Sequence, residues 1–321
     1  MTPPETTSTT PLPPGPQGPL DWGQIHLRPH LLYRISYGNG IQPRPGDPRN
    51  TLINELDPGI AIGLGDHWHL DYTPTLRFYS NRSFRDEVDH SVNLNGATTY
   101  EDWSFGLSQS YLSSSSPLIE TGSQTDQETY STSFSAGYQF NSDLGLDFSA
   151  SQNFRFVNSI NTNQPLSDSR TWSATAGLNY LLWPRLSVGL SGTFGYDNLQ
   201  IGPDMTSEQL QGRINWQPGQ KLTFAFNGGF EDRQFLDSGA PDAINPIFGL
   251  SIIYQPFEVT TISLNASRSV NVSYFQNQIT EATGFSVSLR QRLLGKVYLD
   301  ITGGYGNTKF QASATDRKSV V

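Results

Sequence analysis

The sequence predicts an all-β protein, a transmembrane antiparallel up-and-down β-barrel of the bacterial outer-membrane type. Long stretches of the chain alternate strictly between apolar and polar residues. The connections between these stretches alternate between short and long, and large aromatic residues stand beside the short ones. About fifteen strands are visible, and because single-chain bacterial barrels have even strand numbers, sixteen or more are expected in the complete protein.

The alternation is clearest over residues 128–157, ETYSTSFSAGYQFNSDLGLDFSASQNFRFV. Even positions are mostly apolar and odd positions polar, with one interruption at the turn tripeptide Asn141-Ser142-Asp143. Side chains of a strand point alternately to opposite faces, so each half has one apolar and one polar face. Each half is also as long as the roughly 9–11 residues that a tilted strand needs to cross a bilayer.

The same pattern recurs from residue 25 onward, and each recurrence predicts one strand. The predicted strands cover 25–37, 56–64, 68–78, 92–94 and beyond, 103–111, 130–140, 144–156, 172–180, 186–196, 210–216, 222–230, 248–254, 262–272, 285–293 and 297–305. Prolines on the apolar faces of the first three strands, Pro29, Pro58 and Pro74, predict a local weakening of the hydrogen-bond ladder.

The connections indicate how the barrel is oriented. Short ones are predicted near 65–67, 100–102, 141–143, 183–185, 218–221, 255–258 and 294–296, and longer ones near 38–50, 79–89, 112–128, 157–169, 197–207, 231–245, 275–280 and after 306. Bacterial barrels have short periplasmic turns and longer extracellular loops, which predicts a periplasmic N-terminus. An aromatic girdle is expected at the periplasmic interface. Its predicted members are Trp68, Trp103, Trp183, Trp216 and Phe257.

Composition excludes several other classes of protein. Only 35% of the 321 residues are hydrophobic, the mean hydropathy is −0.44, and no apolar run approaches the roughly 18 residues of a transmembrane helix. The formal net charge of −9 argues against nucleic acid as a partner. Without cysteine there is neither a disulfide framework nor a thiolate metal site.

The two ends of the chain lack the barrel pattern. Residues 1–22 are rich in Pro and Thr and predict a disordered periplasmic tail, which is a candidate surface for a periplasmic partner. The start has no signal-peptide pattern, so we expect that a signal was removed or that the chain starts late. The barrel is assigned to residues 23–321, and we expect that it is truncated before a sixteenth strand that closes against 25–37. The alternative is that one strand was split or missed.

Several short motifs at the start of the barrel resemble the second family of predicted outer-membrane β-barrel porins. They are Leu27-x-Pro29-x-Leu31-x-Tyr33, Tyr37-Gly38-Asn39-Gly40, Leu56-x-Pro58-Gly59 and Trp68-x-Leu70-x-Tyr72-x-Pro74. The resemblance implies a barrel in the outer membrane of Gram-negative bacteria and a link to exopolysaccharide transport. It brings no catalytic residues with it, and this sequence departs from the family in lacking a signal peptide and a closing strand.

The polar faces of the predicted strands carry charges of both signs, which we expect to line a pore. The candidates are Arg28, Arg34, Glu55, Asp57, Asp71, Arg77, Asp147, Arg155, Arg213, Glu231, Arg290, Arg292 and Asp300. Opposed charges orient water and polar solutes in pores, whereas in the alternative interpretation they form salt bridges in a plugged interior. Acids in the longer connections, among them Asp86 and Glu87, are expected to keep loops solvated.

These observations predict a porin-like barrel that lets small polar solutes or saccharides diffuse through the outer membrane. The alternative is a non-conducting barrel with a structural or surface-interaction role and a plugged lumen. The partners expected are outer-membrane lipid, lipopolysaccharide and the solute. No enzyme is predicted, because no Ser/His pair or GxSxG motif is present. No cofactor is expected, and His67, His69 and Asp71 have a spacing that metal sites use but are better explained as polar lining and turn residues.

Overall fold

The computed structural model describes residues 20–38, 50–118, 123–159, 166–238, 242–273, 278–295 and 297–312. Most of the predicted tail, residues 1–19, lies outside the described part of the chain. Its last residues, Asp21–Trp22, form the two-residue strand β1, which pairs with the start of the first long strand. No helix in the described part of the chain is long and apolar enough to cross a membrane.

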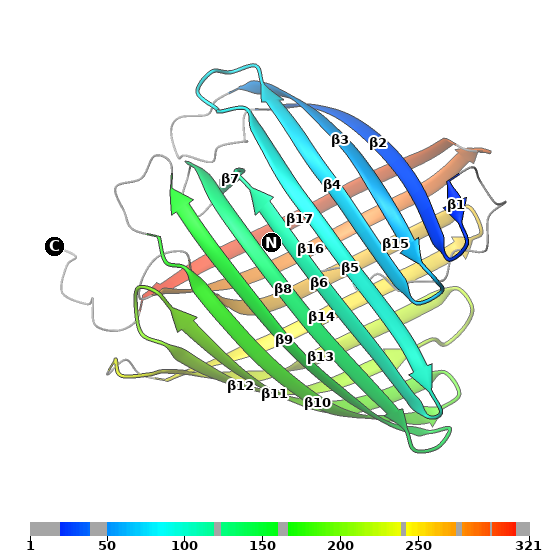
Figure 1. Ribbon diagram of the computed structural model, residues 1–321. Helices are drawn as coiled ribbons and strands as arrows, with labels where there is room; N and C mark the ends of the chain where they lie inside the picture. Colours follow the sequence, from blue (N-terminus) through cyan, green and yellow to red (C-terminus); the bar gives the residue numbers. More distant parts are fainter. Residues whose placement is uncertain are drawn as a thin grey trace.

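Seventeen strands follow one another along the described chain (Figure 1). They are β1 (Asp21–Trp22), β2 (Ile25–Gly38), β3 (Thr51–Leu64), β4 (Trp68–Tyr79), β5 (Glu87–Tyr100), β6 (Trp103–Ser114), β7 (Pro117–Leu118), β8 (Ser123–Gln139), β9 (Leu144–Ser159), β10 (Ser169–Trp183), β11 (Leu186–Leu199), β12 (Met205–Trp216), β13 (Leu222–Phe235), β14 (Ala243–Phe257), β15 (Thr260–Val272), β16 (Gln278–Leu294) and β17 (Val297–Ala312). All but β1 and β7 are long strands, which confirms the fifteen predicted.

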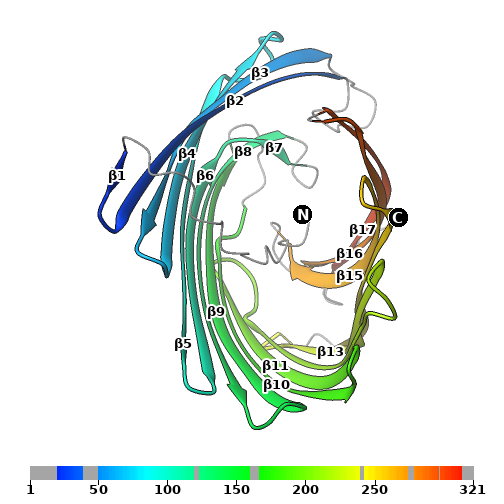
Figure 2. The same cartoon turned by 90° about the vertical axis from the view of Figure 1, so that its right-hand side faces the viewer.

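Each long strand pairs antiparallel with the next one along the chain, as in an up-and-down barrel. The predicted all-β fold class is therefore confirmed. Viewed from the end, the sheet curves around a central axis (Figure 2). Among the described residues no strand register joins β17 to β2, and these two strands lie apart in Figure 2. A further strand that closes against β2 stays a prediction.

The two ends of the sheet differ in the length of their connections. One end carries 65–67, 101–102, 140–143, 184–185, 217–221, 258–259 and 295–296, and the other carries 39–50, 80–86, 115–122, 160–168, 200–204, 236–242 and 273–277. The difference is largest at the start of the chain, and it disappears only around β12, where 200–204 and 217–221 are equally long. We refer to these as the short-turn end and the long-connection end.

Several strands begin before the first apolar residue of the predicted pattern. Strand β5 begins at Glu87, β14 at Ala243 and β16 at Gln278. The outward face of β13 shows the reason, because Phe226 and Phe230 are followed by Asp232 on the same face. Apolar alternation marks only the part of a strand that faces lipid, whereas the hydrogen-bond ladder continues beyond it into water.

Proline interrupts the ladder between β3 and β4, as the sequence predicted for Pro58 and Pro74, whereas the β2–β3 register runs without a break past Pro29. The register passes from Leu56 opposite Leu76 directly to Ile60 opposite Tyr72, and Pro58 and Pro74 fall in the interval. Proline has no amide hydrogen, so neither residue can donate to the neighbouring strand. The topology is unaffected because the register is the same on both sides of the interruption.

Candidate functional site

The polar face of the sheet is its concave face. Arg213 of β12 forms an ion pair with Asp147 of β9 (Nη2 to Oδ2 3.1 Å), although β10 and β11 lie between these strands. Neighbouring strands are about 4.8 Å apart, so side chains can converge over three strand intervals only on the inside of a curve. Cross-strand partners share a face, and their registers place the other odd-numbered polar residues of β8 to β13 on this side as well.

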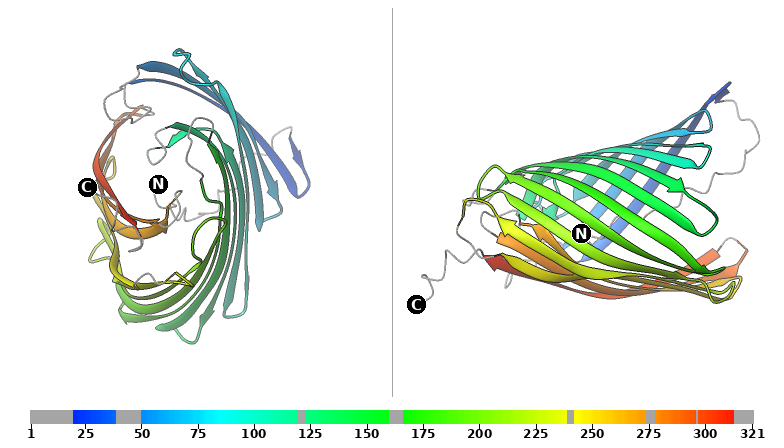
Figure 3. Two further views of the ribbon diagram at one scale, coloured as in Figure 1. Left: turned by 90° about the vertical axis from the view of Figure 1, so that its left-hand side faces the viewer. Right: turned by 90° about the horizontal axis from the view of Figure 1, so that it is seen from below.

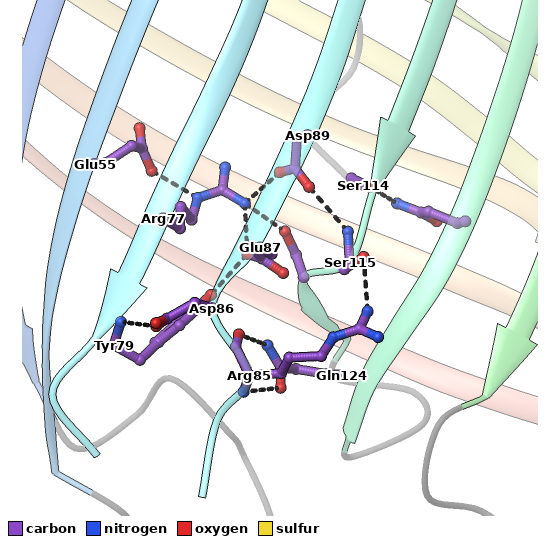
Figure 4. Close-up of polar contacts among 12 residues, drawn as sticks. Glu55, Arg77, Tyr79, Arg85, Asp86, Glu87, Asp89, Ser114, Ser115 and Gln124 are labelled. Carbon is purple, nitrogen blue, oxygen red and sulfur yellow. Dashed lines mark hydrogen bonds and ion pairs between the residues drawn. The ribbon is translucent and has the colours of Figure 1, made fainter. Parts of the chain in front are cut away.

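A dense group of charges lies on β2, β3, β4 and β5 near the long-connection end, and Figure 4 shows its part on β3 to β5. We call it the Arg77 cluster, and its members are Arg34, Glu55, Asp57, Arg77, Glu87 and Asp89. Arg77 binds three carboxylates, through Nε to Glu55 (2.7 Å) and through Nη1 to Glu87 (2.9 Å) and Asp89 (2.5 Å). Arg34 of β2 pairs with Asp57 (2.9 Å) and also with Glu55.

Neighbouring polar groups complete the coordination of this cluster. Tyr79 donates its hydroxyl to Glu87 (2.8 Å), and the amide of Ser115 donates to Asp89 (3.0 Å). Glu87 and Asp89 are buried, whereas Arg34 is largely exposed. Because four carboxylates face two guanidinium groups, the cluster is acidic overall. It ties the four strands β2 to β5 together and gives this part of the interior a negative surface.

A second buried group lies on β11, β12 and β13. Arg233 binds Glu231 (Nε to Oε1 2.8 Å) and approaches Asp197 (Nη1 to Oδ2 3.5 Å). Gln209 donates to the other oxygen of Glu231 (2.8 Å), and Thr171 of β10 donates to Asp197 (2.6 Å). Glu231 is only 1% exposed. The two carboxylates are thus matched by one guanidinium and by neutral donors, which buried charges require.

Neutral side chains form most of the concave face between these two groups. They hydrogen-bond to one another along and across strands: Asn93 to Ser91, Ser108 to Asn95, Gln127 to Ser114, Asn153 to Ser131, Ser151 to Ser173, Thr175 to Thr193 and Asn227 to Gln211. Hydroxyl and amide groups both donate and accept. This face can therefore exchange hydrogen bonds with water or with a hydroxylated solute without a strong preference for charge.

The residues proposed from the sequence as pore lining are distributed over these groups. Arg34, Glu55, Asp57 and Arg77 lie in the Arg77 cluster, and Glu231 lies in the second group. Asp147 and Arg213 form their own pair, and Arg290 approaches Asp300 (3.5 Å) with both side chains exposed. Asp71 accepts a hydrogen bond from Thr73, Arg155 is buried, and Arg28 and Arg292 are exposed. Their role in permeation stays a prediction.

Four of the charged residues that complete these groups lie outside the strands predicted from the apolar alternation. Glu87 was assigned to a solvated loop, which is wrong, because it is a buried residue of β5 bound to Arg77. Asp89, Asp197 and Arg233 were also assigned to connections and lie on strands. The polar–apolar–polar alternation of Glu87-Val88-Asp89 is the signal that indicates an earlier start for the strand predicted at 92–94 and beyond. It was overlooked because the outward residues there are too few to show an apolar face.

The predicted girdle residues stand at strand ends beside the short-turn end. Trp68, Trp103, Trp183, Trp216 and Phe257 are all at least 40% exposed. A second aromatic row crosses the outward face nearer the long-connection end. Tyr111 lies tilted against Tyr130, Phe154 meets Trp172 edge-on, and Trp172 stacks on Tyr196. At a rise of about 3.4 Å per residue and a tilt of about 40°, Trp172 and Trp183 are roughly 25–30 Å apart along the barrel axis. This matches the height of a lipid-facing band.

No group of three or more His, Asp or Glu residues within the described ranges is arranged to hold a metal ion. His69 and Asp71, which have a ligand-like spacing in the sequence, lie on β4 opposite Gly63 and Ala61 of β3. On the β5 side, His69 and Asp71 lie opposite Asn95 and Asn93.

Comparison with known proteins identifies the fold but not a family. No protein-family model matches the chain, and no curated protein sequence matches it. Among solved structures, the FrpB iron transporter from Neisseria meningitidis aligns over 92% of this chain and 60% of its own length, with a TM-score of 0.55 and 8% identity.

Two further matches are weaker in structure. The ferric yersiniabactin uptake receptor FyuA from Yersinia pestis covers 92% of this chain and 58% of its own length, with 15% identity and a TM-score of 0.40. The siderophore receptor PiuA from Acinetobacter baumannii covers 91% and 61%, with 11% identity and a TM-score of 0.42. The chain thus spans about three fifths of the length of the structures that it matches.

The fold of this chain is therefore that of a bacterial outer-membrane β-barrel. The similarity to FrpB shows the architecture alone, because 8% identity transfers no functional residue. The comparisons support the outer-membrane barrel that the resemblance implied, and they do not extend to the porin family itself.

Proposed function

We propose that this protein is an outer-membrane barrel through which small polar solutes, saccharides among them, pass by diffusion. The proposal rests on the concave face, which is a continuous belt of hydrogen-bonding Ser, Thr, Asn and Gln side chains flanked by paired charges. Such a surface replaces water hydrogen bonds without holding a solute tightly, and fast permeation needs this weak, multi-site binding. The protein would act without chemistry on the solute.

The remaining expectations about surroundings belong to this proposal. The outward aromatic rows and the apolar band between them suit contact with outer-membrane lipid and lipopolysaccharide. The short-turn end would then face the periplasm, together with the N-terminal tail and any partner that docks there. FrpB is an iron transporter by name, which agrees with a transport role at the level of the fold. A link to exopolysaccharide export rests on the sequence resemblance.

Reconstitution in planar bilayers tests the proposal directly. We expect the folded protein to produce stepwise conductance and to let liposomes swell in solutions of small neutral sugars. Folding is checked independently by the heat-dependent shift in gel mobility that is typical of barrels. Folded protein that gives neither conductance nor swelling would rule out diffusion and favour the second candidate, a non-conducting barrel. One observation favours that candidate, because part of the sheet itself turns into the interior, as described next.

A further inference from the structure

The ends of β15 and β16 leave the wall of the barrel near the long-connection end. Strand β15 pairs with β14 only as far as Arg268, opposite Phe248. Beyond this point β14 continues to Ala243 while paired with β13 on its other side. Strand β15 also continues, but it stays paired only with β16 up to the Val272–Ile279 pair. The two partners of the β14–β15 ladder therefore separate at Phe248 and Arg268.

This free end turns inward and lies over the concave face. Val270 and Ile279, 6% and 1% exposed, are packed in one apolar cluster with Leu199, Met205 and Ile247 from the ends of β11, β12 and β14. These three residues belong to the inward face of their strands. A strand end that continued along the wall could not reach them. Figure 2 and Figure 3 show β15 curving into the space enclosed by the sheet.

A polar contact from the opposite side shows how far this end extends. Nη2 of Arg155 on β9 donates to the carbonyl oxygen of Ser273, directly after β15 (3.3 Å). Five strands, β10 to β14, separate β9 from β15 around the wall. The end of β15 therefore crosses the inside of the barrel as a chord.

Arg268 stands at the point where β15 leaves β14. Its Nε donates to the carbonyl oxygen of Pro246 on β14 (3.1 Å), and its Nη2 binds Glu281 of β16 (2.7 Å). Proline at position 246 has no amide to continue the ladder, and Arg268 replaces the missing main-chain contact with a side-chain one. One guanidinium thus joins the wall strand to both strands of the inward-turned end.

The other face of this end is polar and open to the interior. Successive residues of a strand point to opposite sides, so Ser269 and Asn271 point away from the apolar cluster that holds Val270. Both are exposed, and Asn271 donates to Ser269 (3.1 Å). A solute that crosses the barrel at this level would pass neutral hydroxyl and amide groups.

We propose that the inward-turned end of β15 and β16 is a built-in constriction that sets the largest solute able to pass the barrel. The apolar cluster and Arg268 hold it in place, and Ser269 and Asn271 form its solute-facing edge. The inference rests on the proposed function, because a size limit has meaning only for a conducting barrel. Its structural part, an end that lies inside the wall, can be tested without any measurement of transport.

Thiol labelling tests the structural part. The natural chain has no cysteine, so a single introduced thiol reports on one position. Val270→Cys is expected to react with a water-soluble maleimide on the order of tenfold more slowly than Ile244→Cys, which is 72% exposed on the outward face of β14. Equal rates at the two positions would show that the end is not packed inside, and would overturn the inference.

Permeation by sugars of graded size tests the functional part. The double variant Arg268→Ala/Val270→Asp removes the tie and places a carboxylate in the apolar cluster, so the end should be released. We expect liposomes that contain it to swell several-fold faster in larger neutral oligosaccharides than those with the natural protein. Arg185→Ala is the matched control, because it removes an exposed Arg from the short turn between β10 and β11, away from the inward-turned end and from the proposed pore lining.

A third variant tests whether solutes pass the edge formed by Ser269 and Asn271. It places a charge on this edge and does not depend on the folding of the double variant. Ser269→Lys should lower single-channel conductance for potassium and shift the reversal potential toward anions. Asn215→Lys, on the exposed inward face near the short-turn end, should have the same effects to a smaller extent.

Unchanged conductance and selectivity in Ser269→Lys would overturn the proposed constriction. If the natural protein is closed and the double variant conducts, the end is a complete plug and the size limit is wrong. If no variant conducts, the proposed function itself fails.

Discussion

Single residues in this sheet are constrained mainly by how closely neighbouring strands approach one another. Gly229 of β13 faces the concave side, and a Cβ built on it would collide with the main chain of β12, at 2.8 Å from the Cα of Gln211 and closer still to the carbonyl oxygen of Leu210. Main-chain atoms cannot rotate away as a side chain can. Gly212, by contrast, has no neighbour nearer than 3.9 Å to such a Cβ.

Gly229→Ala is expected to destabilise the barrel, by roughly 1–3 kcal/mol, because β12 and β13 must move apart to admit the methyl group. The measurement is the temperature at which the compact gel band converts to the unfolded one. Gly212→Ala on the neighbouring strand serves as the control and should leave this temperature nearly unchanged. A Gly229→Ala protein as heat-stable as the control would show that the strands do not approach this closely.

Asp204 braces the connection between β11 and β12, outside the membrane-spanning segments. Burial works to raise the pKa of its carboxyl, but hydrogen bonds donated by the Tyr196 hydroxyl (2.6 Å), the Asn198 amide and the main-chain amide of Leu199 (3.1 Å) outweigh it and hold the pKa below the ordinary value for Asp. Because the pKa is lowered in the folded state, the carboxylate stabilises the fold at every pH above the ordinary pKa of Asp. This stabilisation is lost as the pH falls through the lowered pKa of the folded state.

We therefore expect the connection to loosen only in strong acid. Hydrogen exchange of the Leu199 amide should be slow at pH 6 and accelerate, beyond the intrinsic pH effect, as the pH falls below about 4. In Asp204→Asn the exchange should already be faster at pH 6 and show no such transition. Because the turn is only half-buried, the contribution is no more than about 1 kcal/mol. The same acid transition in both proteins would contradict the assignment.

At the scale of strands, the Arg77 cluster joins β3, β4 and β5 where the ladder is weakest. The main-chain register between β3 and β4 is interrupted at Pro58 and Pro74. The bond of Arg77 to Glu55 of β3 crosses the same pair of strands, and its bonds to Glu87 and Asp89 reach β5. Side-chain charges thus connect strands beside a gap in the main-chain hydrogen bonds.

Arg77→Gln should destabilise the folded protein strongly, because it leaves buried carboxylates without a cation; breaking such a group costs about 3–5 kcal/mol. Adding Glu87→Gln to this variant removes one of the stranded charges and should restore part of the lost stability. Urea unfolding in detergent, followed by tryptophan fluorescence, measures both effects. If the second substitution makes the protein still less stable, the loss in Arg77→Gln does not come from unpaired carboxylates.

For the whole molecule, the named charges of the concave face nearly balance. Arg213 matches Asp147 and Arg290 matches Asp300, while the Arg77 cluster has two carboxylates in excess and the group around Arg233 has one. The resulting field is weak and slightly negative, and it is concentrated near the long-connection end. Ordered pairs of this kind orient water across the lumen without excluding either sign of ion.

The barrel should accordingly show a slight preference for cations. In a tenfold gradient of potassium chloride we expect a reversal potential whose sign indicates cation selectivity. Its size should be well below the roughly 59 mV of an ideal cation channel at 25 °C. Asp57→Asn, which removes one of the excess carboxylates, should move it toward zero. A reversal potential of anion sign in the natural protein would contradict the charge distribution described.

The strands, their order and the face that each residue occupies follow from the amino-acid sequence alone. Period-two alternation is a local property, and a one-residue shift would place every apolar side chain of a strand on the wrong side. The interruption at Pro58 and Pro74 was equally predictable, because proline lacks the donor regardless of its surroundings. The short turns and their aromatic neighbours followed from the same local chemistry.

Which charges meet depends on how the strands are arranged in the folded barrel. Arg213 and Asp147 stand on strands that are not adjacent, and Arg155 reaches Ser273 across the interior. The inward turn of β15 was not predictable either, because Val270 and Val272 resume the apolar pattern of a lipid-facing strand after a single break at Arg268. Alternation tells which face of a strand is apolar, but not whether lipid or the opposite wall covers it. That choice depends on the curvature of the whole sheet.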